Sequence, residues 1–245
     1  MEETAPMGGA AGDGMPQIGM PHALSTVKPP SAAEAAYSGI VDLILARGLR
    51  PGERTSVNLL AARLGLGRMP VKEAVNRLQT EGMLSIKGRS GTTVTTIGPD
   101  AAAQMFALRR ALEAFAAEGA ALRATDDDMA RVRALVEEMH ATSIDDPYGD
   151  GAGPRFVRAN SAFHAAVVGA AHNPFLDRAY GQLQLQLQIV SYLSYRGHNP
   201  DAARRRQREH EEIADALAAR DAERLREALR QHGETTESAL ISQLP

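Results

Sequence analysis

The stretch from Gly48 to Val94 reads GLRPGERTSVNLLAARLGLGRMPVKEAVNRLQTEGMLSIKGRSGTTV and sets the architecture of the first half of the chain. A helix follows Thr55 and Ser56, either of which can accept from the free amides of its first turn, and it ends at Gly65. Pro70 lies in the first turn of the next helix, where a missing amide proton costs no hydrogen bond. The two helices meet across about three residues, which predicts a helix-turn-helix.

The segments on either side of this motif extend the same domain. Apolar residues with helical spacing predict a first helix over residues 33–46. Residues 83–86 and 92–97 are rich in β-branched side chains and predict a hairpin, joined by a basic, glycine-containing loop at 87–91. We therefore predict a winged helix-turn-helix domain over residues 31–97, made of three helices and a β-hairpin wing.

The remainder of the chain, after a short linker at 98–100, is expected to be helical. The expected helices cover residues 101–123, 126–141, 155–171, 174–196, 202–219 and 221–240, with a long loop at 142–154. Residues 183–189 alternate between Leu or Ile and Gln, as a half-buried strand does. We expect a helix there, because Leu and Gln are good helix formers and no partner strand is evident. The predicted fold class is mainly α, with an all-helical bundle of about six helices over residues 101–241.

Composition sets limits on the class of protein. The 245 residues exceed one ordinary domain, include no cysteine and contain no apolar run long enough to span a bilayer. Residues 1–30 are rich in Gly and Pro and are expected to be disordered, and the absence of a signal-peptide pattern favours a cytoplasmic location. Residues 31–97 carry nine basic against five acidic side chains, whereas residues 98–245 carry 17 against 22. This division favours a first domain that faces nucleic acid.

The Gly48 to Val94 stretch resembles the winged-helix domain of GntR-type bacterial transcription regulators. The resemblance rests on a PGE turn, the segments LAARLGLGR and PVKEAVNRLQTEG, and a wing that contains glycine. The helical remainder is similar to the FadR branch of this family, with its FCD effector domain, and the two resemblances cover about residues 33–240. They imply a homodimer that binds a roughly palindromic double-stranded DNA operator. We expect a repressor, with no enzymatic activity and no membrane partner.

The resemblance also implies which side chains contact DNA. The candidates are Asn58, Gly67, Arg68, Met69 and Lys72, together with Arg89 in the wing. Arg68 and Lys72 match recognition-helix residues, whereas Gly67 offers no hydroxyl to a phosphate and Met69 offers only apolar contact. Lys72 presents a point charge where a planar guanidinium is commoner, so the operator is expected to differ from those of relatives. These charges could instead be merely solvated, but the short turn, Pro70 and the wing favour DNA binding.

Three histidines lie on the apolar sides of three different expected helices. His164 shares its face with Asn160 one turn earlier, and His210 and His232 have apolar neighbours at helical spacings. Any one of them alone is better explained as a hydrogen-bonded core histidine. Leaving three imidazoles and an amide buried without partners would cost ~4–12 kcal/mol, comparable with the whole stability of a domain. A divalent cation would satisfy all three, and imidazole suits zinc, nickel, copper or iron(II).

The resemblance implies a metal site at the same residues. The metal-binding subset of FCD domains has Asp or Asn, two residues, Phe-His, and two further histidines on the last two helices; Asn160, His164, His210 and His232 match this pattern. Zinc or nickel is expected. Because the amide of Asn160 leaves the full charge of the metal, open coordination positions are hypothesised to bind a small organic acid effector. Arg109 matches the family's arginine that can hold a carboxylate, although an exposed charge or an ion pair with Glu113 is equally compatible.

Other interpretations stay open at this point. The helical half could only dimerise, with its polar cluster hydrogen-bonded through water. Three histidines around zinc are also found in metal hydrolases, but no general base at a suitable spacing and no HExxH pattern is present. The basic run from Arg204 to Arg208 is followed by Glu209, Glu211 and Glu212, which favours helical i,i+4 pairing over a nucleic-acid patch.

Overall fold

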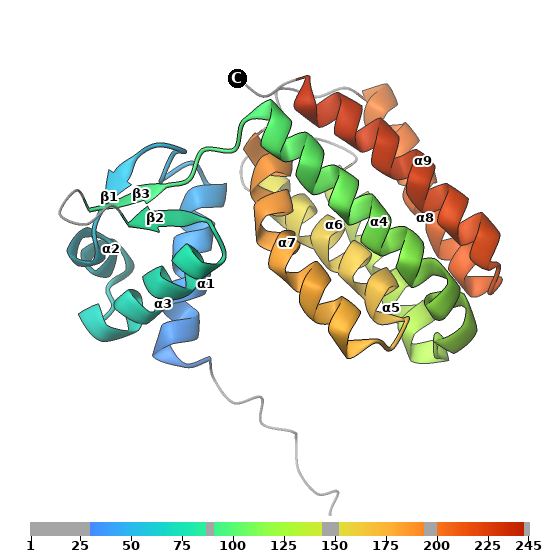
Figure 1. The fold of residues 1–245 in the computed structure, drawn as a ribbon, viewed down its shortest axis with the longest axis horizontal. Helices are drawn as coiled ribbons and strands as arrows, with labels where there is room; N and C mark the ends of the chain where they lie inside the picture. Colours follow the sequence, from blue (N-terminus) through green and yellow to red (C-terminus); the bar gives the residue numbers. More distant parts are fainter. Residues whose placement is uncertain (1–29, 87–90, 144–151, 194–199, 243–245) are drawn as a thin grey trace, which may run out of the picture. The chain divides into compact units, whose positions relative to one another are not determined.

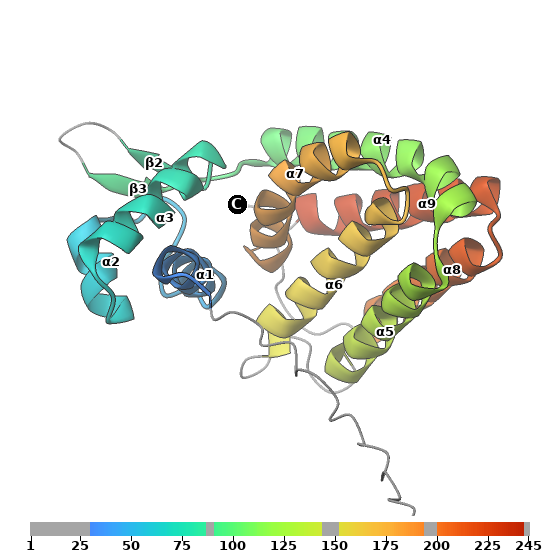
Figure 2. The same ribbon diagram turned by 90° about the horizontal axis from the view of Figure 1, so that it is seen from below.

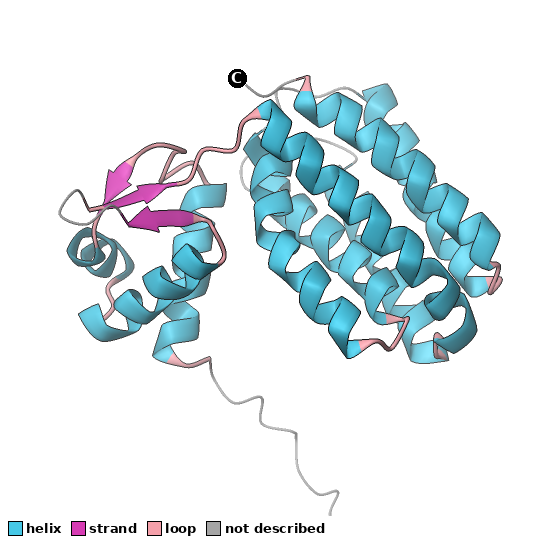
Figure 3. Ribbon diagram, viewed as in Figure 1, coloured by secondary structure: helices cyan, strands magenta, loops and turns pink. Residues whose placement is uncertain are grey.

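The computed structural model describes residues 30–86, 91–143, 152–193 and 200–242, which are mainly helical with one small sheet (Figure 3). The mainly α fold class with a winged helix-turn-helix is thereby confirmed. Three features expected from the sequence fall outside the described residues: the disordered tail, the wing tip with Arg89, and most of the loop at 142–154.

Three helices form the first half of the fold: α1 (Ala32–Leu45), α2 (Val57–Leu64) and α3 (Arg68–Thr80) (Figure 1). Ser31 caps α1 in a capping box with Glu34, and the Ser56 hydroxyl accepts from the backbone amide of Leu59 at the start of α2. Gly65 ends α2 with a φ of 65°, a left-handed conformation that favours glycine. The turn between α2 and α3 therefore consists of the three residues from Gly65 to Gly67.

The sheet has the strand order β1-β3-β2 and is antiparallel throughout. Its strands are β1 (Arg54–Thr55), β2 (Leu84–Ile86) and β3 (Thr92–Val94). β1 was not predicted, because a strand of two residues is too short to show an alternation of apolar and polar side chains. Its pairing also depends on β3, which lies about 40 residues later in the sequence. The strand expected over 92–97 ends at Val94. Thr95 still donates its amide to the carbonyl of Met83, which closes the base of the hairpin.

The core of this half comes from the periodicity of its three helices. Apolar side chains that are at most 1% exposed include Ile40, Ile44, Leu60, Val71, Val75 and Leu78. On α3, burying Val71, Ala74, Val75 and Leu78 leaves the opposite side of the helix to solvent. The recognition helix is thus fixed by one face and open on the other.

Six further helices form a bundle: α4 (Pro99–Arg123), α5 (Asp126–Ser143), α6 (Ala152–Gly169), α7 (Pro174–Leu193), α8 (Pro200–Ala218) and α9 (Ala222–Ile241). They pack as a closed ring in which α4 contacts α9, α9 contacts α8, α8 contacts α5, α5 contacts α6, α6 contacts α7, and α7 returns to α4 (Figure 2). The interior is filled mostly by small and branched side chains, such as Ala117, Val167, Ile213 and Leu217, with Phe163 among them.

The bundle helices differ from the expected ones mainly at their ends. α4 begins at Pro99 inside the expected linker, because proline suits the first position of a helix, and α6 begins at Ala152 inside the expected loop. The alternating segment is helical, as predicted. Gln184 and Gln188, one turn apart, donate to the carbonyl and hydroxyl of Ser161 on α6. No helix among the described residues is both long and apolar enough to cross a bilayer.

Candidate functional site

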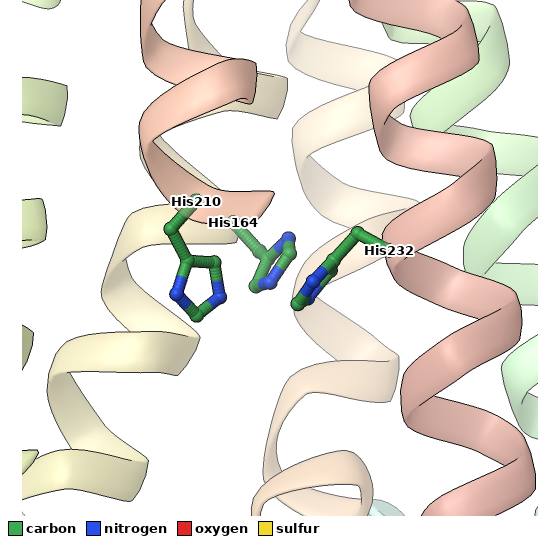
Figure 4. A group of neighbouring side chains, drawn as sticks. All are labelled: His164, His210 and His232. Carbon is green, nitrogen blue, oxygen red and sulfur yellow. The ribbon is translucent and has the colours of Figure 1, made fainter. Parts of the chain in front are cut away.

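The bundle brings the three predicted histidines together in its interior. His164 lies on α6, His210 on α8 and His232 on α9, and each side chain is at most 2% exposed. Their ring centroids are 4.6–5.7 Å apart. One nitrogen from each ring can be chosen so that all three lie within 4.8 Å of one another, with the rings gathered around a common point (Figure 4).

Most of these imidazole nitrogens lack a hydrogen-bond partner among the described residues. Both nitrogens of His164 and both of His210 are buried and unpartnered. An unsatisfied buried polar group costs ~1–3 kcal/mol, so an apolar core would not retain such a cluster without another binding partner. Nδ1 of His232 is satisfied by Glu209 Oε2 at 2.9 Å. The cluster therefore offers unused lone pairs that converge from three helices.

The electrostatic surroundings keep the three imidazoles neutral. Burial lowers the pKa of His210 and His232 well below the ordinary value, and the charges of neighbouring histidines lower it further. Burial also lowers the pKa of His164, and the charge of Arg109 adds to this effect. Neutral imidazole is the form that binds transition metals, so the donor set fits a divalent cation of the zinc or nickel type.

Arg109 and Glu113 of α4 form a buried ion pair beside this cluster. The Nε atom of Arg109 lies 2.8 Å from Glu113 Oε1, and both side chains are at most 5% exposed. Tyr180 of α7 donates its hydroxyl to the same carboxylate oxygen at 2.7 Å. Burial alone would raise the pKa of Glu113, but the charge of Arg109 and the hydrogen bond from its guanidinium hold the pKa of the carboxyl below its usual range.

The same carboxylate reaches the histidine cluster. Glu113 Oε1 lies 3.1 Å from His164 Nδ1, an electrostatic contact that is not aligned as a hydrogen bond. Nη2 of Arg109 and Oε2 of Glu113 remain buried without partners among the described residues. Of the two alternatives to effector binding given above for Arg109, the ion pair with Glu113 is observed and the exposed charge is not. One guanidinium nitrogen still remains available to a ligand.

Two cavities adjoin the histidines and meet at Asn160. The first, here called the Arg109 cavity, is lined by Arg109, Asn160, Ser161, His164, Tyr180 and Gln188, among others. The second, the Arg206 cavity, is lined by Asn160, Arg205, Arg206, His232, Thr236 and Leu240, among others. Asn160 thus lies on α6 one turn before His164 and borders both cavities. Asn160 is the one predicted ligand that lines both the cavity beside His164 and the cavity beside His232.

The candidate DNA-contacting residues lie on the exposed side of the helix-turn-helix. Arg68, Met69 and Lys72 are exposed in the first two turns of α3, and Asn58 is exposed on α2. Met69 is 66% exposed, so its side chain is open to an apolar contact. Gly67 is the N-cap of α3 and supplies no side-chain hydrogen bond, so the first-turn amides of α3 stay open to an external acceptor such as a phosphate.

Sequence reasoning missed several residues that shape the site. Tyr180 contacts Glu113 and Glu209 contacts His232 from positions that their own helices do not mark as special, and Arg206 was assigned to surface pairing. In the structure the basic run pairs only in part: Arg204 contacts Asp201, Glu212 contacts Arg224 of α9, and Glu209 contacts His232. The position of Glu209 directly before His210 was the one available signal.

Comparisons with known proteins agree with this architecture. The family model described as FCD domain matches residues 104–235, and the model described as bacterial regulatory proteins, gntR family, matches residues 32–94. The Uxu operon transcriptional regulator of Escherichia coli is 28% identical over 82% of this chain and 84% of its own length. A protein of Paenarthrobacter nicotinovorans described as "Probable D-xylose utilization operon transcriptional repressor" is 30% identical over 71% of this chain and 73% of its own length. The solved structure of Escherichia coli McbR/YncC has a TM-score of 0.75 at 24% identity, covering 87% of this chain and 99% of that one.

Proposed function

The chain belongs to the gntR family of bacterial regulatory proteins and carries an FCD domain, and we propose on this basis that a metal-bound carboxylate effector controls its affinity for operator DNA. The protein is a DNA-binding transcriptional regulator of the GntR/FCD type. The observation that carries the proposal is the convergence of three buried, neutral histidines, four of whose nitrogens have no partner in the part of the chain that the structure describes.

In the proposed metal centre His164, His210 and His232 each supply one nitrogen, and the amide oxygen of Asn160 supplies a fourth ligand. Zinc accepts nitrogen and oxygen ligands of this kind, and an exogenous ligand would bind by expansion from four to five ligands or by displacing the weak amide oxygen. Glu209 holds Nδ1 of His232, and Nε2 of that ring, whose printed contact is the Thr236 hydroxyl at 3.5 Å, would bind the metal. When bound, the cation would supply a Lewis-acidic positive charge that attracts an anion.

A small organic acid is the effector class that suits these surroundings. The metal retains its charge because its proposed ligands are neutral, and Nη2 of Arg109 is buried without a partner among the described residues at the edge of the same cavity. A carboxylate could bind the metal and accept a hydrogen bond from Arg109. The pair with Glu113 holds the guanidinium in place beforehand, which lowers the entropic cost of binding.

For the DNA-binding half we propose that Arg68 and Lys72 contact the operator, with Met69 making apolar contact and the open amides after Gly67 binding a phosphate. Arg68 and Lys72 are exposed and form no ion pair with another described residue. Their charges are therefore available to phosphates or base edges. Asn58 on α2 would contact the DNA backbone, and Arg89 of the wing would contribute a further contact.

We further propose a homodimer whose interface includes α4. Leu108, Phe115 and Leu122 are 48%, 67% and 73% exposed and recur every seven residues, so they form one outward apolar stripe. Ala101 and Ala111 lie on the same stripe and are also exposed. A second copy of the same stripe is its natural partner, because twofold-related helices present identical surfaces to each other. The dimer would place two DNA-binding domains on the two half-sites of an operator.

Coupling between effector and DNA would run through α4. This one helix follows the wing strand β3 after the short connection at 95–98, carries Arg109 and Glu113 at the effector site, and presents the apolar stripe. From Pro99 to Glu113 it extends roughly 20 Å as a rigid rod. A coupling of ~1–3 kcal/mol would change operator affinity about 5- to 150-fold. Repression is the proposed direction, in keeping with the relative described as a repressor.

The competing view, a helical half that only dimerises, is tested by metal analysis. The protein purified without chelator is expected to contain about one zinc or nickel per chain, measured by inductively coupled plasma mass spectrometry. His210→Ala is expected to lose the metal, whereas the matched control His172→Ala, whose ring pairs with Asp128 at the surface, is expected to keep it. Equal metal content in the two variants would reject the proposed centre.

A further inference from the structure

The Arg206 cavity is lined by more positive than negative charge. Arg206 lies one turn before His210 on α8, so its side chain projects from the same face. Its Nε atom is buried without a hydrogen-bond partner among the described residues. Arg205 lines the cavity as well, and Glu209, the nearest acidic group of the same helix, is engaged with His232. Arg109 differs in this respect, because Glu113 pairs with it directly.

The two cavities also differ in size. The Arg109 cavity measures about 10 Å³, which on this measure holds about one water. The Arg206 cavity measures about 50 Å³ and has apolar walls from Phe156, Val157 and Leu240. Val157, Asn160 and Ser191 line both cavities, with His164 in the wall of one and His232 in the wall of the other. A ligand bound between the histidines therefore has room to extend toward Arg206 and little room to extend toward Arg109.

We propose that Arg206 forms a second anion subsite, so that the effector is a dicarboxylate with a short aliphatic spacer. This inference rests on the proposed metal-dependent effector site. One carboxylate binds the metal held by the histidines, and the second accepts hydrogen bonds from the Arg206 guanidinium. The spacer packs on Leu240 and Phe156. Thr236, which lines the same cavity, supplies a hydroxyl next to the spacer.

The chemistry of the subsite favours a second acid over a neutral group. A guanidinium with a buried free donor is stabilised most by an ionised, planar acceptor. A neutral hydroxyl would add no negative charge beside Arg206, whose acidic neighbour Glu209 is already engaged with His232. A purely apolar tail would desolvate the guanidinium without replacing its hydrogen bonds to water. A monocarboxylate can therefore bind the metal but leaves Arg206 unsatisfied.

The test compares dicarboxylates with monocarboxylates of the same carbon number on the full-length, zinc-loaded protein. Isothermal titration calorimetry with succinate, glutarate and adipate is set against butyrate, pentanoate and hexanoate. The best dicarboxylate is expected to bind at least about tenfold more tightly than the monocarboxylate with the same number of carbon atoms. This affinity ratio corresponds to about 1.4 kcal/mol, which is within the range for a hydrogen bond to a charged group. Arg206→Met is expected to bring this ratio close to one, and Arg206→Lys to restore part of it.

Arg208→Met is the matched control, since Arg208 is exposed on the same helix and does not line the cavity. It should leave the ratio at the wild-type value, and zinc content should be equal in all variants. A wild-type ratio near one, or an equal loss for both acids in Arg206→Met, overturns the second subsite. If monocarboxylates bind only in the presence of zinc and dicarboxylates bind no more tightly than they do, the Arg206 subsite is rejected and the metal-dependent effector site stands. If no acid binds in a zinc-dependent manner, the proposed function fails together with it.

Discussion

Nδ1 of His232 lies 2.9 Å from Oε2 of Glu209, the residue that directly precedes His210 on α8. One turn of α8 therefore contains one of the three clustered histidines, His210, and also the Glu209 carboxylate that holds the ring of a second, His232. Since Nδ1 of His232 donates to this carboxylate, the tautomer with an unprotonated Nε2 is favoured, and the Thr236 hydroxyl lies 3.5 Å from that nitrogen. The same contact orients the ring toward the centre of the cluster.

Glu209→Gln is expected to weaken metal binding without unfolding the protein. The amide keeps the size of the side chain but removes the negative charge that makes His232 a stronger donor, and losses of such orienting groups cost about 10–100-fold in metal affinity. Competition with a chromogenic zinc chelator measures the change. Glu211→Gln, at an exposed position of the same helix that accepts from Gln207, should bind zinc like wild type. Equal affinity in the two variants would contradict the orienting role.

The buried pair of Arg109 and Glu113 predicts a non-additive mutational cycle. Removing either partner leaves an uncompensated buried charge, so Arg109→Met and Glu113→Leu should each lower the free energy of unfolding by about 3–5 kcal/mol. The double variant should be destabilised by much less than the sum, because no charge then remains unpaired. Urea unfolding of the metal-free protein measures all three. Additive losses would mean that the pair does not act as a unit.

The lowered pKa values of the three histidines predict a pH-dependent stability for the metal-free protein. Their folded pKa values lie below the unfolded value of about 6.5, so the unfolded chain binds more protons as pH falls below that value. Stability is therefore fully present above about pH 7 and is lost as pH decreases toward 5.5. The slope cannot exceed about 4 kcal/mol per pH unit for three groups. Glu209 opposes it in part, because burial raises the pKa of that carboxyl.

Unfolding in urea at several pH values between 5.5 and 8, with a chelator present, measures this slope. His210→Asn removes one of the three titrating groups and should reduce the slope by up to about a third. His172→Ala is the control, since its ring is half exposed at the surface. A slope that is the same in wild type and His210→Asn would show that these imidazoles do not carry the dependence.

Periodicity was enough to predict that each of the three histidines lies inward, whereas their grouping in one site was predicted from the cost of burying them unpaired and from the family's metal-binding pattern. Each of His164, His210 and His232 repeats with apolar neighbours every three or four residues, and a helix that buries its apolar face must bury such a histidine too. Since each helix contributes one inward face, three inward histidines at similar heights meet in the bundle. The same logic predicted the buried face of α3 and hence the exposed side that carries Arg68 and Lys72.

Contacts between distant helices were beyond this logic. The Tyr180 hydroxyl meets Glu113 across 67 positions of sequence, and nothing in the local pattern of α7 marks that tyrosine. The i,i+4 spacing suggested a pair of Arg109 and Glu113 but not its burial, because charged residues are rarely buried. Arg206 was assigned to surface pairing for a similar reason. Its Nε atom is buried with no partner among the described residues, and the other walls of the cavity that it lines come mainly from α6 and α9.

Arg68→Ala and Lys72→Ala are expected to weaken operator binding while leaving the fold intact. Both side chains face away from the core of the DNA-binding domain, so the midpoint of thermal unfolding should stay unchanged. If a residue contacts a phosphate, each loss should reduce the slope of log affinity against log salt by about one; if it contacts a base edge, binding should lose about 1–3 kcal/mol and become less selective. Fluorescence anisotropy with the promoter DNA of the protein's own operon at several salt concentrations measures both quantities. Wild-type affinity in the double variant would reject the assignment, and Arg131→Ala on α5 serves as control.

The apolar stripe on α4 predicts that a charge introduced at its centre dissociates the proposed dimer. Phe115→Glu places a carboxylate at the centre of the stripe, and two copies of it would face each other across a twofold axis. Like charges at a buried interface cost several kcal/mol, so the variant is expected to sediment as a monomer at micromolar concentration, where wild type is expected to sediment as a dimer.

Phe175→Glu is the matched control, because Phe175 is 78% exposed but lies on α7 outside the stripe. If Phe175→Glu dissociates the dimer and Phe115→Glu does not, the interface lies on another face of the bundle. Dissociation by Phe115→Glu should also weaken operator binding, since a single DNA-binding domain contacts only one half-site.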